Sequence, residues 1–424
     1  MGYVISSLAL GQMLSSTLLG YLSNKCKNTK APVLAGFVIN IIGNLWMAYT
    51  EAFPVPARRW VLLASRFVVG IGTGNGSVIQ AYLAQSTTSQ ERHKVMTLNE
   101  GVVSFSVMIG TGIQAAFVPL GYKPNSSGYF YFNMYTAPCY LSICLSLIII
   151  ILTLLFWKDY NISVKEDKDE FASKRLPNYD MAPAITCIVI RFVIIYCIVY
   201  EETIGSPFTM VMFNWNRKEA VLYNGIIFGV AGVLEFCGNL FVGDILLKYF
   251  SERTALVGGL TSYILFYITT FSWPGLPKLN NTLYDGNLWY DTIHNNLNDT
   301  AIGCNYNWCS YTTKIYLVQY VLAYVFVIAS CVLALGPATS LFSKILGPRR
   351  QGTMQGILVS SGSFAAMISP IVVSHLFQTF GPRIAYAAAI FVLLVALVAT
   401  FCTYRRQVPF EERNKTLHYN TTAL

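Results

Sequence analysis

The chain has 424 residues, of which 54% are hydrophobic and only 12% are charged. The charged share is about half of that in soluble domains, which excludes an ordinary soluble protein and indicates a polytopic membrane protein. The formal net charge is +9. The basic residues are scattered over short loops and form no block interleaved with aromatic residues, so nucleic acid is not an expected partner and the lipid bilayer is.

Apolar segments long enough to cross a bilayer predict the transmembrane helices. In chain order these spans are 2–22, 31–50, 60–83, 96–120, 133–157, 183–212, 220–243, 254–273, 315–342, 352–378 and 383–404. Met1 opens directly within an apolar segment, without a charged region or a cleavage site after it, so we expect no signal peptide.

A charged, proline-bearing linker divides the predicted spans into five before it and six after it. We expect a helical half at 1–157, a cytoplasmic linker at 158–182, a second helical half at 183–404 and a cytoplasmic tail at 405–424. Most of the 29 lysines and arginines fall on one face if the 23–30 loop is cytoplasmic, and the excess of basic residues on that face sets the orientation.

The opposite face carries features of an oxidising lumen. Its longest loop, at about 274–314, contains the glycosylation sequons at Asn280 and Asn298, and a third sequon at Asn125 follows the fourth span. Cys304 and Cys309 are the two cysteines in an extramembrane loop on this face. We therefore predict three glycosylation sites and a disulfide bond between these cysteines.

Arg66 stands within the apolar run of the third span and is followed by glycines at alternate positions, Gly70, Gly72 and Gly74. A guanidinium within hydrocarbon costs at least ~3 kcal/mol, so Arg66 is expected either to face a wet cavity or to lock two helices together. The glycines allow a neighbouring helix to approach closely. A dinucleotide-binding loop is excluded, because Asn75 stands where a glycine would be required.

The spacing Arg-x-x-x-Gly-x-Gly-x-Gly resembles the fourth-helix signature of the major facilitator superfamily. Members of this family have two six-helix halves joined by a cytoplasmic loop, so the predicted spans resemble a facilitator that lacks its first helix. The resemblance implies an all-α polytopic membrane protein with the 12-helix pattern minus the first, about 11 transmembrane helices.

The loop from Gly20 to Lys25 resembles the family's Gly-x-x-x-Asp-Arg gating loop, with Asn24 where an aspartate is usual. Its counterpart in the second half is expected between Asp244 and Arg253. The missing aspartate removes one charge from the usual gating network.

The likeness extends beyond these signatures to a lysosomal branch of the superfamily over nearly the whole chain. The shared motifs are Gly11-Gln-Met, Asn133-Met-Tyr-Thr-Ala-Pro138, Glu202-Thr-Ile, Ala220-Val-Leu-Tyr-Asn-Gly-Ile-Ile227, Cys304-x-x-x-x-Cys309, Ser343-Lys-Ile-Leu-Gly-Pro348 and Gly381-Pro-Arg383. This resemblance implies a multi-pass glycoprotein of late endosomes and lysosomes with a transport or chloride-conducting activity.

Ionisable residues within spans are the candidate solute and ion pathway. Arg191 lies about eight residues into its span. Glu202 follows about three helical turns later on nearly the same face, whereas Glu201 points about 100° away. We therefore expect only Glu202 to share a cavity lining with Arg191.

Glu235 lies near the middle of its span. A carboxyl group at that depth is expected to hold a proton unless it meets a cation or water, which suits proton coupling; alternatively it makes one interhelical hydrogen bond. Glu100 is a further titratable group at the start of the 96–120 span, which lacks the proline typical of proton antiporters. Asn75 and Gln114 are neutral candidates for solute contacts or for helix packing.

Three functions fit these residues. The first is an endolysosomal transporter that moves a small anionic solute by alternating access, with Arg66 and Arg191 binding the anion and protons as a candidate coupling ion. The second is an anion channel of the same fold, and the third is a membrane regulator that transports nothing. Neither H-E-x-x-H nor G-x-S-x-G occurs and the four histidines form no cluster, so an enzyme, a metal site and a cofactor are not expected.

Overall fold

The computed structural model describes residues 2–88, 91–117, 120–121, 132–158, 179–241, 250–278, 307–310, 312–410 and 412–413. These residues are mainly helical, and the one β-bridge among them joins Lys278 to Thr313. The predicted all-α fold class is therefore confirmed.

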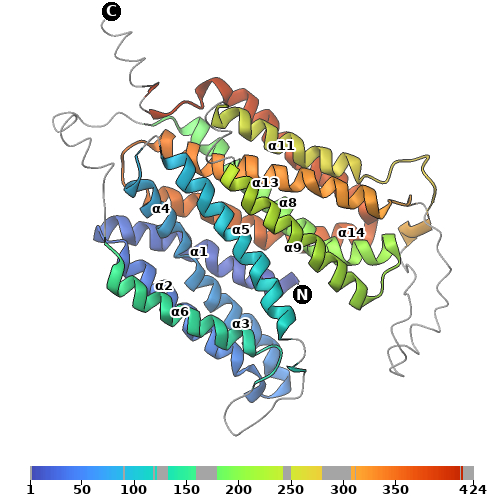
Figure 1. The fold of residues 1–424 in the computed structure, drawn as a ribbon, viewed down its shortest axis with the longest axis horizontal. Helices are drawn as coiled ribbons and strands as arrows, with labels where there is room; N and C mark the ends of the chain where they lie inside the picture. The colour runs from blue at the N-terminus through green and yellow to red at the C-terminus, as the bar shows by residue number, and fades with distance from the viewer. Residues whose placement is uncertain are drawn as a thin grey trace, which may run out of the picture.

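The long helices run nearly parallel and antiparallel to one another (Figure 1). They are α1 (Gly2–Cys26), α2 (Lys30–Ala48), α3 (Val55–Thr73), α4 (Gly76–Ser86), α5 (Arg92–Ala116), α6 (Ala137–Phe156), α8 (Met181–Phe213), α9 (Arg217–Phe241), α11 (Glu252–Thr269), α13 (Leu317–Leu346) and α14 (Gly352–Thr403). Within the described ranges, eight helical stretches are long and apolar enough to cross a membrane. The helices α5 and α11 lie where the 96–120 and 254–273 spans were predicted.

Two predicted spans differ in detail from the structure. The 60–83 span begins earlier, at Val55, and is interrupted between Thr73 and Gly76, so that α3 and α4 together make one crossing. The 352–378 and 383–404 spans are two helices within α14, separated by a kink at Gly381, whose φ of 80° is left-handed. Glycine adopts this conformation without strain, and Pro382 follows it.

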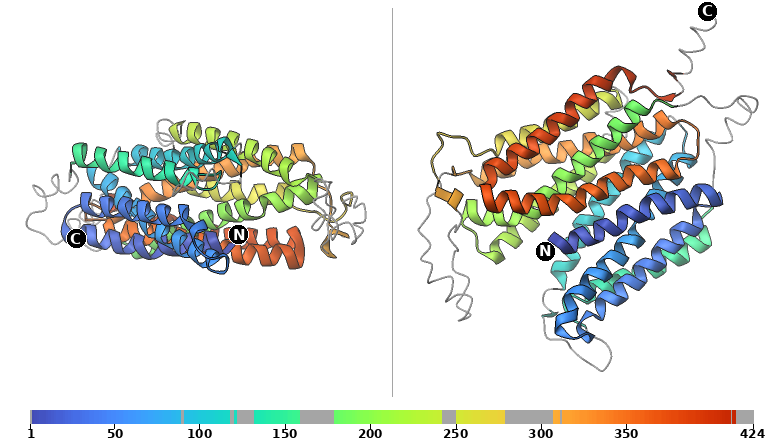
Figure 2. Two further views of the ribbon diagram at one scale, coloured as in Figure 1. Left: turned by 90° about the horizontal axis from the view of Figure 1, so that it is seen from below. Right: turned by 180° about the vertical axis from the view of Figure 1, so that it is seen from behind.

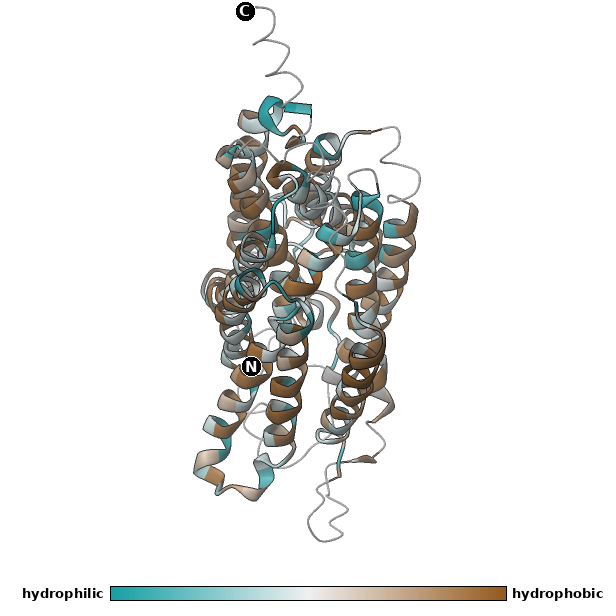
Figure 3. Ribbon diagram, turned by 90° about the vertical axis from the view of Figure 1, so that its left-hand side faces the viewer, coloured by the Kyte–Doolittle hydropathy of each residue, from teal (hydrophilic) through white to brown (hydrophobic). Residues whose placement is uncertain are grey.

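The helices form two groups (Figures 1 and 2). One contains α1, α2, α3 and α6, and the other contains α8, α9, α11, α13 and α14. Helix α5 lies between the groups and packs mainly against α9 and α13. Hydrophobic residues cover the middle of most helices and polar residues gather toward their ends (Figure 3), as a bilayer requires.

The seam between the two groups runs along α1 and α14. Small and hydroxyl side chains line it: Thr17 and Ser360 place their hydroxyl oxygens 2.7 Å apart, and Ser360 also donates to the Met13 carbonyl. Gly356 lies against the backbone of Ser16 so closely that a β-carbon would come within 2.7 Å of its carbonyl oxygen. Two backbones can approach this closely only where side chains are small.

Candidate functional site

A cavity of about 640 Å³ lies within the second group of helices, with α5 and Gln12 of α1 forming the side that faces the first group. Its wall is formed mostly by α8, α9, α13 and α14, with Gln12 from α1, Tyr263 from α11 and four residues of α5. The volume is in the range of small-molecule binding sites. The cavity therefore lies where relative movement of the two groups would change access to it.

A buried ion pair joins α5 to α8 at one end of the cavity. Arg191 Nη1 lies 3.0 Å from Glu100 Oε1, and the two residues are 9% and 6% exposed. Arg191 also donates to Thr339 of α13 at 3.1 Å, and Gln80 of α4 donates to Glu100 at 3.2 Å. A carboxylate and a guanidinium compensate each other's charge away from water, so this cluster connects four helices across the seam.

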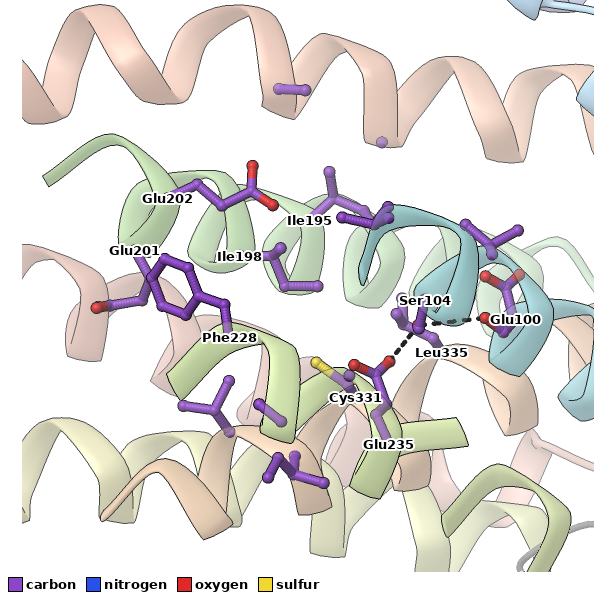
Figure 4. Close-up of a pocket in the computed structure, with 18 of the residues that line it drawn as sticks. Glu100, Ser104, Ile195, Ile198, Glu201, Glu202, Phe228, Glu235, Cys331 and Leu335 are labelled. Atoms are coloured by element: carbon purple, nitrogen blue, oxygen red, sulfur yellow. Dashed lines mark hydrogen bonds between the residues drawn. The ribbon is translucent and has the colours of Figure 1, made fainter. Parts of the chain in front are cut away.

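Glu235 of α9, in the same group as α8, reaches the same region. Ser104 of α5 donates a hydrogen bond of 2.5 Å to its carboxylate and is also bonded to the Glu100 carbonyl oxygen at 3.2 Å (Figure 4). The predicted interhelical hydrogen bond of Glu235 is therefore present. No ion pair to Glu235 occurs among the described side chains.

Both glutamates of α8 line the far part of the cavity together with Arg191, so the expectation that only Glu202 would do so is wrong. The lining therefore takes in α8 residues that differ by about 80° to 100° around the helix axis. Glu202 is exposed, whereas Glu201 is 3% exposed. In Figure 4 the two carboxylates point in different directions, that of Glu202 toward Ile195 and Ile198.

The other predicted pathway residues lie away from this cavity or cannot be placed. Arg66 is half-buried on α3 and is not among the lining residues; its Nε atom is buried and has no hydrogen-bond partner within the described ranges. Asn75 donates to the Val33 carbonyl of α2 at 3.4 Å, which is a helix-packing contact. The side chain of Gln114 lies outside the described residues.

The predicted gating residues meet the second half at one end of the seam. Asn24 donates to Thr353 at 2.9 Å and accepts from the Gly352 amide at 3.0 Å. A β-carbon at Gly20 would overlap the Gly352 carbonyl oxygen, and Lys25 is exposed. An amide at position 24 can thus cap the first turn of α14 as an aspartate would, because its side-chain oxygen accepts a hydrogen bond from a helix N-terminal amide.

The counterpart loop is described only in part. Asp244 lies outside the described residues. Arg253 donates to the Tyr404 carbonyl at 3.4 Å and places its guanidinium 5.5 Å from the centre of the Tyr404 ring.

The three glycines after Arg66 lie at close helix contacts. A β-carbon at Gly70 would overlap the Leu8 carbonyl of α1, one at Gly74 would overlap the Ser15 hydroxyl, and one at Gly72 would come within 2.7 Å of the Asn40 amide of α2. Their place in the structure is therefore helix packing.

The predicted lumenal features are only partly visible. Cys309 is disulfide-bonded and buried, while Cys304 lies outside the described residues. The three predicted glycosylation sites, Asn125, Asn280 and Asn298, also lie outside them.

Several groups that line the cavity or bind the ion pair had no signal that singled them out in the sequence. Thr339, which bonds to the ion pair, is one threonine among many in apolar spans, and the lining residues Tyr263 and Tyr324 are two of 27 tyrosines. Pro337, inside α13, could have drawn attention to this part of the helix, because prolines in membrane helices free backbone groups that need other partners. Over the described residues, no group of three His, Cys, Asp or Glu side chains could hold a metal ion.

Two groups of membrane helices, with a mainly apolar cavity that carries a buried ion pair and further carboxyl groups, are typical of a membrane transporter fold. The chain belongs to the Major Facilitator Superfamily, whose profile matches residues 1–286 and 301–421. This confirms the resemblance seen in the sequence.

Individual relatives agree with the family. The chain is 29% identical over 440 residues to major facilitator superfamily domain-containing protein 8 of Xenopus laevis, covering 98% of this chain and 86% of that protein. The structure is similar to the human organic anion transporter MFSD10, with a TM-score of 0.63 and 15% identity over 94% of this chain and 83% of that chain. It is also similar to the proton:xylose symporter XylE of E. coli, with a TM-score of 0.68 and 13% identity over 96% and 86%.

Proposed function

We propose that this chain is a transporter of the endolysosomal membrane that moves a small solute by alternating access, with its C-terminal tail in the cytoplasm. The observation that carries the proposal is the cavity that α5 and α1 share with the second group of helices, with the Glu100–Arg191 pair in its wall. A solute in this cavity contacts α1 and α5 on one side and α8 to α14 on the other. Movement at the seam would expose it to one face of the membrane and then to the other.

The acidic part of the solute would bind at Arg191. In the described state this guanidinium is occupied by Glu100, and a buried cation needs a partner throughout the cycle. When Glu100 takes a proton, Arg191 is free for a carboxylate or phosphate group, which binds arginine through charge-assisted hydrogen bonds. An acidic lumen would supply that proton, so the solute and the proton would enter the cavity together from the lumen.

The side chains around Glu100 support the step in which a proton on Glu100 releases Arg191 for the solute. Arg191 faces it from α8, Thr339 from α13 and Gln80 from α4, while Glu235 of α9 lies nearby through Ser104. Only Arg191 among these is a cation. The similar human protein is an organic anion transporter, which agrees with an acidic solute for this chain.

Flux in proteoliposomes tests the proposal. We would measure uptake of glutamate, lactate and inorganic phosphate, and chloride current, with and without an inward proton gradient. We expect uptake at carrier rates that follows the gradient, loss of uptake in Arg191→Ala and loss of pH dependence in Glu100→Gln. Glu51→Gln is a matched control, because Glu51 lies outside the cavity and a glutamine keeps an acceptor for Asn133.

The other outcomes separate the alternatives. A large chloride current independent of pH would replace the transporter with an anion channel. A folded, glycosylated protein that moves none of these solutes would favour the regulator.

A further inference from the structure

The end of the cavity away from Glu100 and Arg191 has an excess of carboxylates. Glu201 and Glu202 follow Arg191 along α8 by about 15 and 16 Å of helical rise. Neither is in an ion pair among the described residues. Glu201 is 3% exposed and its Oε1 atom has no hydrogen-bond partner in the described part of the chain. Tyr267 of α11 interacts with the Glu201 carboxyl group, but no described cation does, and a buried carboxylate that is only partly compensated is costly. This position therefore suits a cation or a proton.

Aromatic rings surround the same end of the cavity. Phe228 of α9 lies beside Glu201 in Figure 4, and the end of its ring is 3.4 Å from where a β-carbon on Gly205 would stand. Its ring centre is 5.7 Å from that of Tyr324, which lines the cavity together with Tyr263. Aromatic faces attract cations, and most strongly where water is excluded.

The charges of the residues that line the whole cavity also favour a cationic group in the solute. Arg191 is the one cation among the described lining residues, and Glu100 already neutralises it. Glu201, Glu202 and Glu235 remain as acids without a cation. Any of these carboxyl groups that is ionised would repel a solute that carried only negative charge, whereas a protonated amine would compensate it.

We propose that Glu201, Glu202, Phe228 and Tyr324 form an amine-binding site, so that the solute carries a protonated amine at this end of the cavity. Together with the acidic group placed at Arg191, which rests on the proposed function, this defines a zwitterionic solute. Arg191 and Glu201 are about 15 Å apart along α8, so the solute is elongated, with its two charges at opposite ends. An extended chain of three residues, about 10 Å long, serves as the probe.

A charge series on one scaffold tests the amine site directly. The probes are trialanine, its N-acetylated form, its C-terminal amide and the N-acetylated amide, which have nearly the same size and differ in their charged ends. Binding to the purified full chain would be measured by isothermal titration calorimetry, and uptake by the same chain in proteoliposomes. Trialanine and its amide are expected to bind at least ~10-fold more tightly than the two acetylated forms.

Variants identify the group responsible. Glu202→Gln, which is exposed and tolerant of substitution, is expected to abolish the discrimination against the acetylated forms. Glu201→Gln tests the buried partner, and Glu51→Gln is the control expected to bind like the wild type. Retained discrimination in both Glu202→Gln and Glu201→Gln would overturn the proposal, as would equal binding of acetylated and free amines or binding of none of the four probes.

Measuring both binding and uptake separates the proposed amine site from the proposed transport function. Discrimination in binding without any uptake would leave the amine site standing and contradict the transporter. Uptake of acidic solutes without discrimination for the amine would leave the transporter standing, and would assign to Glu201 and Glu202 the role of protonated wall residues.

Discussion

At the scale of single residues, the Glu100–Arg191 ion pair matters both for the stability of the fold and for the proposed transport. It is buried, it joins α5 to α8, and its hydrogen bonds extend to α4 and α13. Removing one member leaves the other charge without compensation in a non-aqueous site. The same dependence makes the pair sensitive to any ligand or proton that competes for either member.

Arg191→Met is therefore expected to lower the free energy of unfolding by about 3–5 kcal/mol, while the double variant Glu100→Gln with Arg191→Met returns to within about 2 kcal/mol of the wild type. Equilibrium unfolding in detergent measures both. A single variant as stable as the wild type would show that Glu100 finds another cation or holds a proton.

Asp180, just before α8, anchors the segment after α14. Arg406 makes two hydrogen bonds to its carboxylate, at 2.8 and 2.9 Å. Partial burial raises the pKa of Asp180, but the hydrogen bonds from Arg406 and from the Ala182 amide outweigh burial and hold that pKa below its ordinary value. A lowered pKa means that the contact stabilises the fold above the unfolded-state pKa and is lost as the pH falls through the folded one.

The melting-temperature difference between wild type and Asp180→Asn is thus expected at neutral pH and should shrink below about pH 4. Its size corresponds to at most ~1 kcal/mol, because the Arg406 side chain is 59% exposed. Arg406→Gln should behave like Asp180→Asn. A difference that persists unchanged to pH 3 would assign the effect to something other than the ionised carboxylate.

The sequence predicts part of this site and misses the rest for a physical reason. Arg191, Glu202 and Glu235 are detectable because a charge within an apolar span is costly and needs a function or a partner. The partners are not detectable in the same way: Thr339 and Gln80 are ordinary neutral residues, and Glu201 differs from Glu202 only in direction. Arg66 carries the same sequence signal as Arg191, but its place on α3 keeps it out of the described cavity.

Among the helices, the contact of α1 with α14 decides how the two groups can move. Hydroxyl groups and glycines bring the two backbones together along the seam. The helices themselves are predictable from apolar length. The break between α3 and α4 and the exact start of α3 are not, because they depend on packing against α1 and α2.

Cysteines at positions 17 and 360 test whether the seam opens. Thr17→Cys with Ser360→Cys is expected to form a disulfide under mild oxidation, because the native hydroxyl oxygens are 2.7 Å apart. The crosslink should lower uptake at least ~10-fold, and reduction should restore it, since a locked seam prevents closure and opening. Thr17→Cys with Ser361→Cys is the control, because Ser361 instead donates to Ile188 of α8. Full activity of the crosslinked protein would exclude movement at this seam.

Glycine substitutions test the packing itself. Gly356→Val is expected to destabilise the protein by about 1–3 kcal/mol, because its β-carbon would meet the Ser16 backbone. Gly229→Val, where a β-carbon would meet nothing within 4 Å, should cost much less. Thermal unfolding of the two variants compares them. Equal losses would mean that helix propensity, and not the close approach, controls the effect.

At the scale of the whole molecule, the proposed transport cycle uses three features together. The cavity holds the solute, the seam between α1 and α14 opens and closes, and the Glu100–Arg191 pair exchanges a proton and a solute group. The family fold makes such a cycle available, and the cavity places charged groups where it would operate. Family membership could be inferred from the glycine signature and the span pattern. The solute could not, since it depends on which side chains share one cavity, and that is settled by packing between helices far apart in the sequence.

Distances at the two ends of the seam test alternating access most directly. Spin labels would be placed at Lys25 and Arg350 at one end, and at Tyr3 and Ile371 at the other; all four residues are exposed. The exposed free cysteines, Cys26, Cys144, Cys237 and Cys402, would first be replaced by serine. Electron paramagnetic resonance would follow both pairs in liposomes at pH 7.5 and pH 5, with Glu100→Gln for comparison. If access alternates, one separation grows as the other shrinks, and Glu100→Gln shifts the balance at pH 7.5 toward that of the wild type at pH 5. Separations that stay fixed, or that change together, would contradict alternating access.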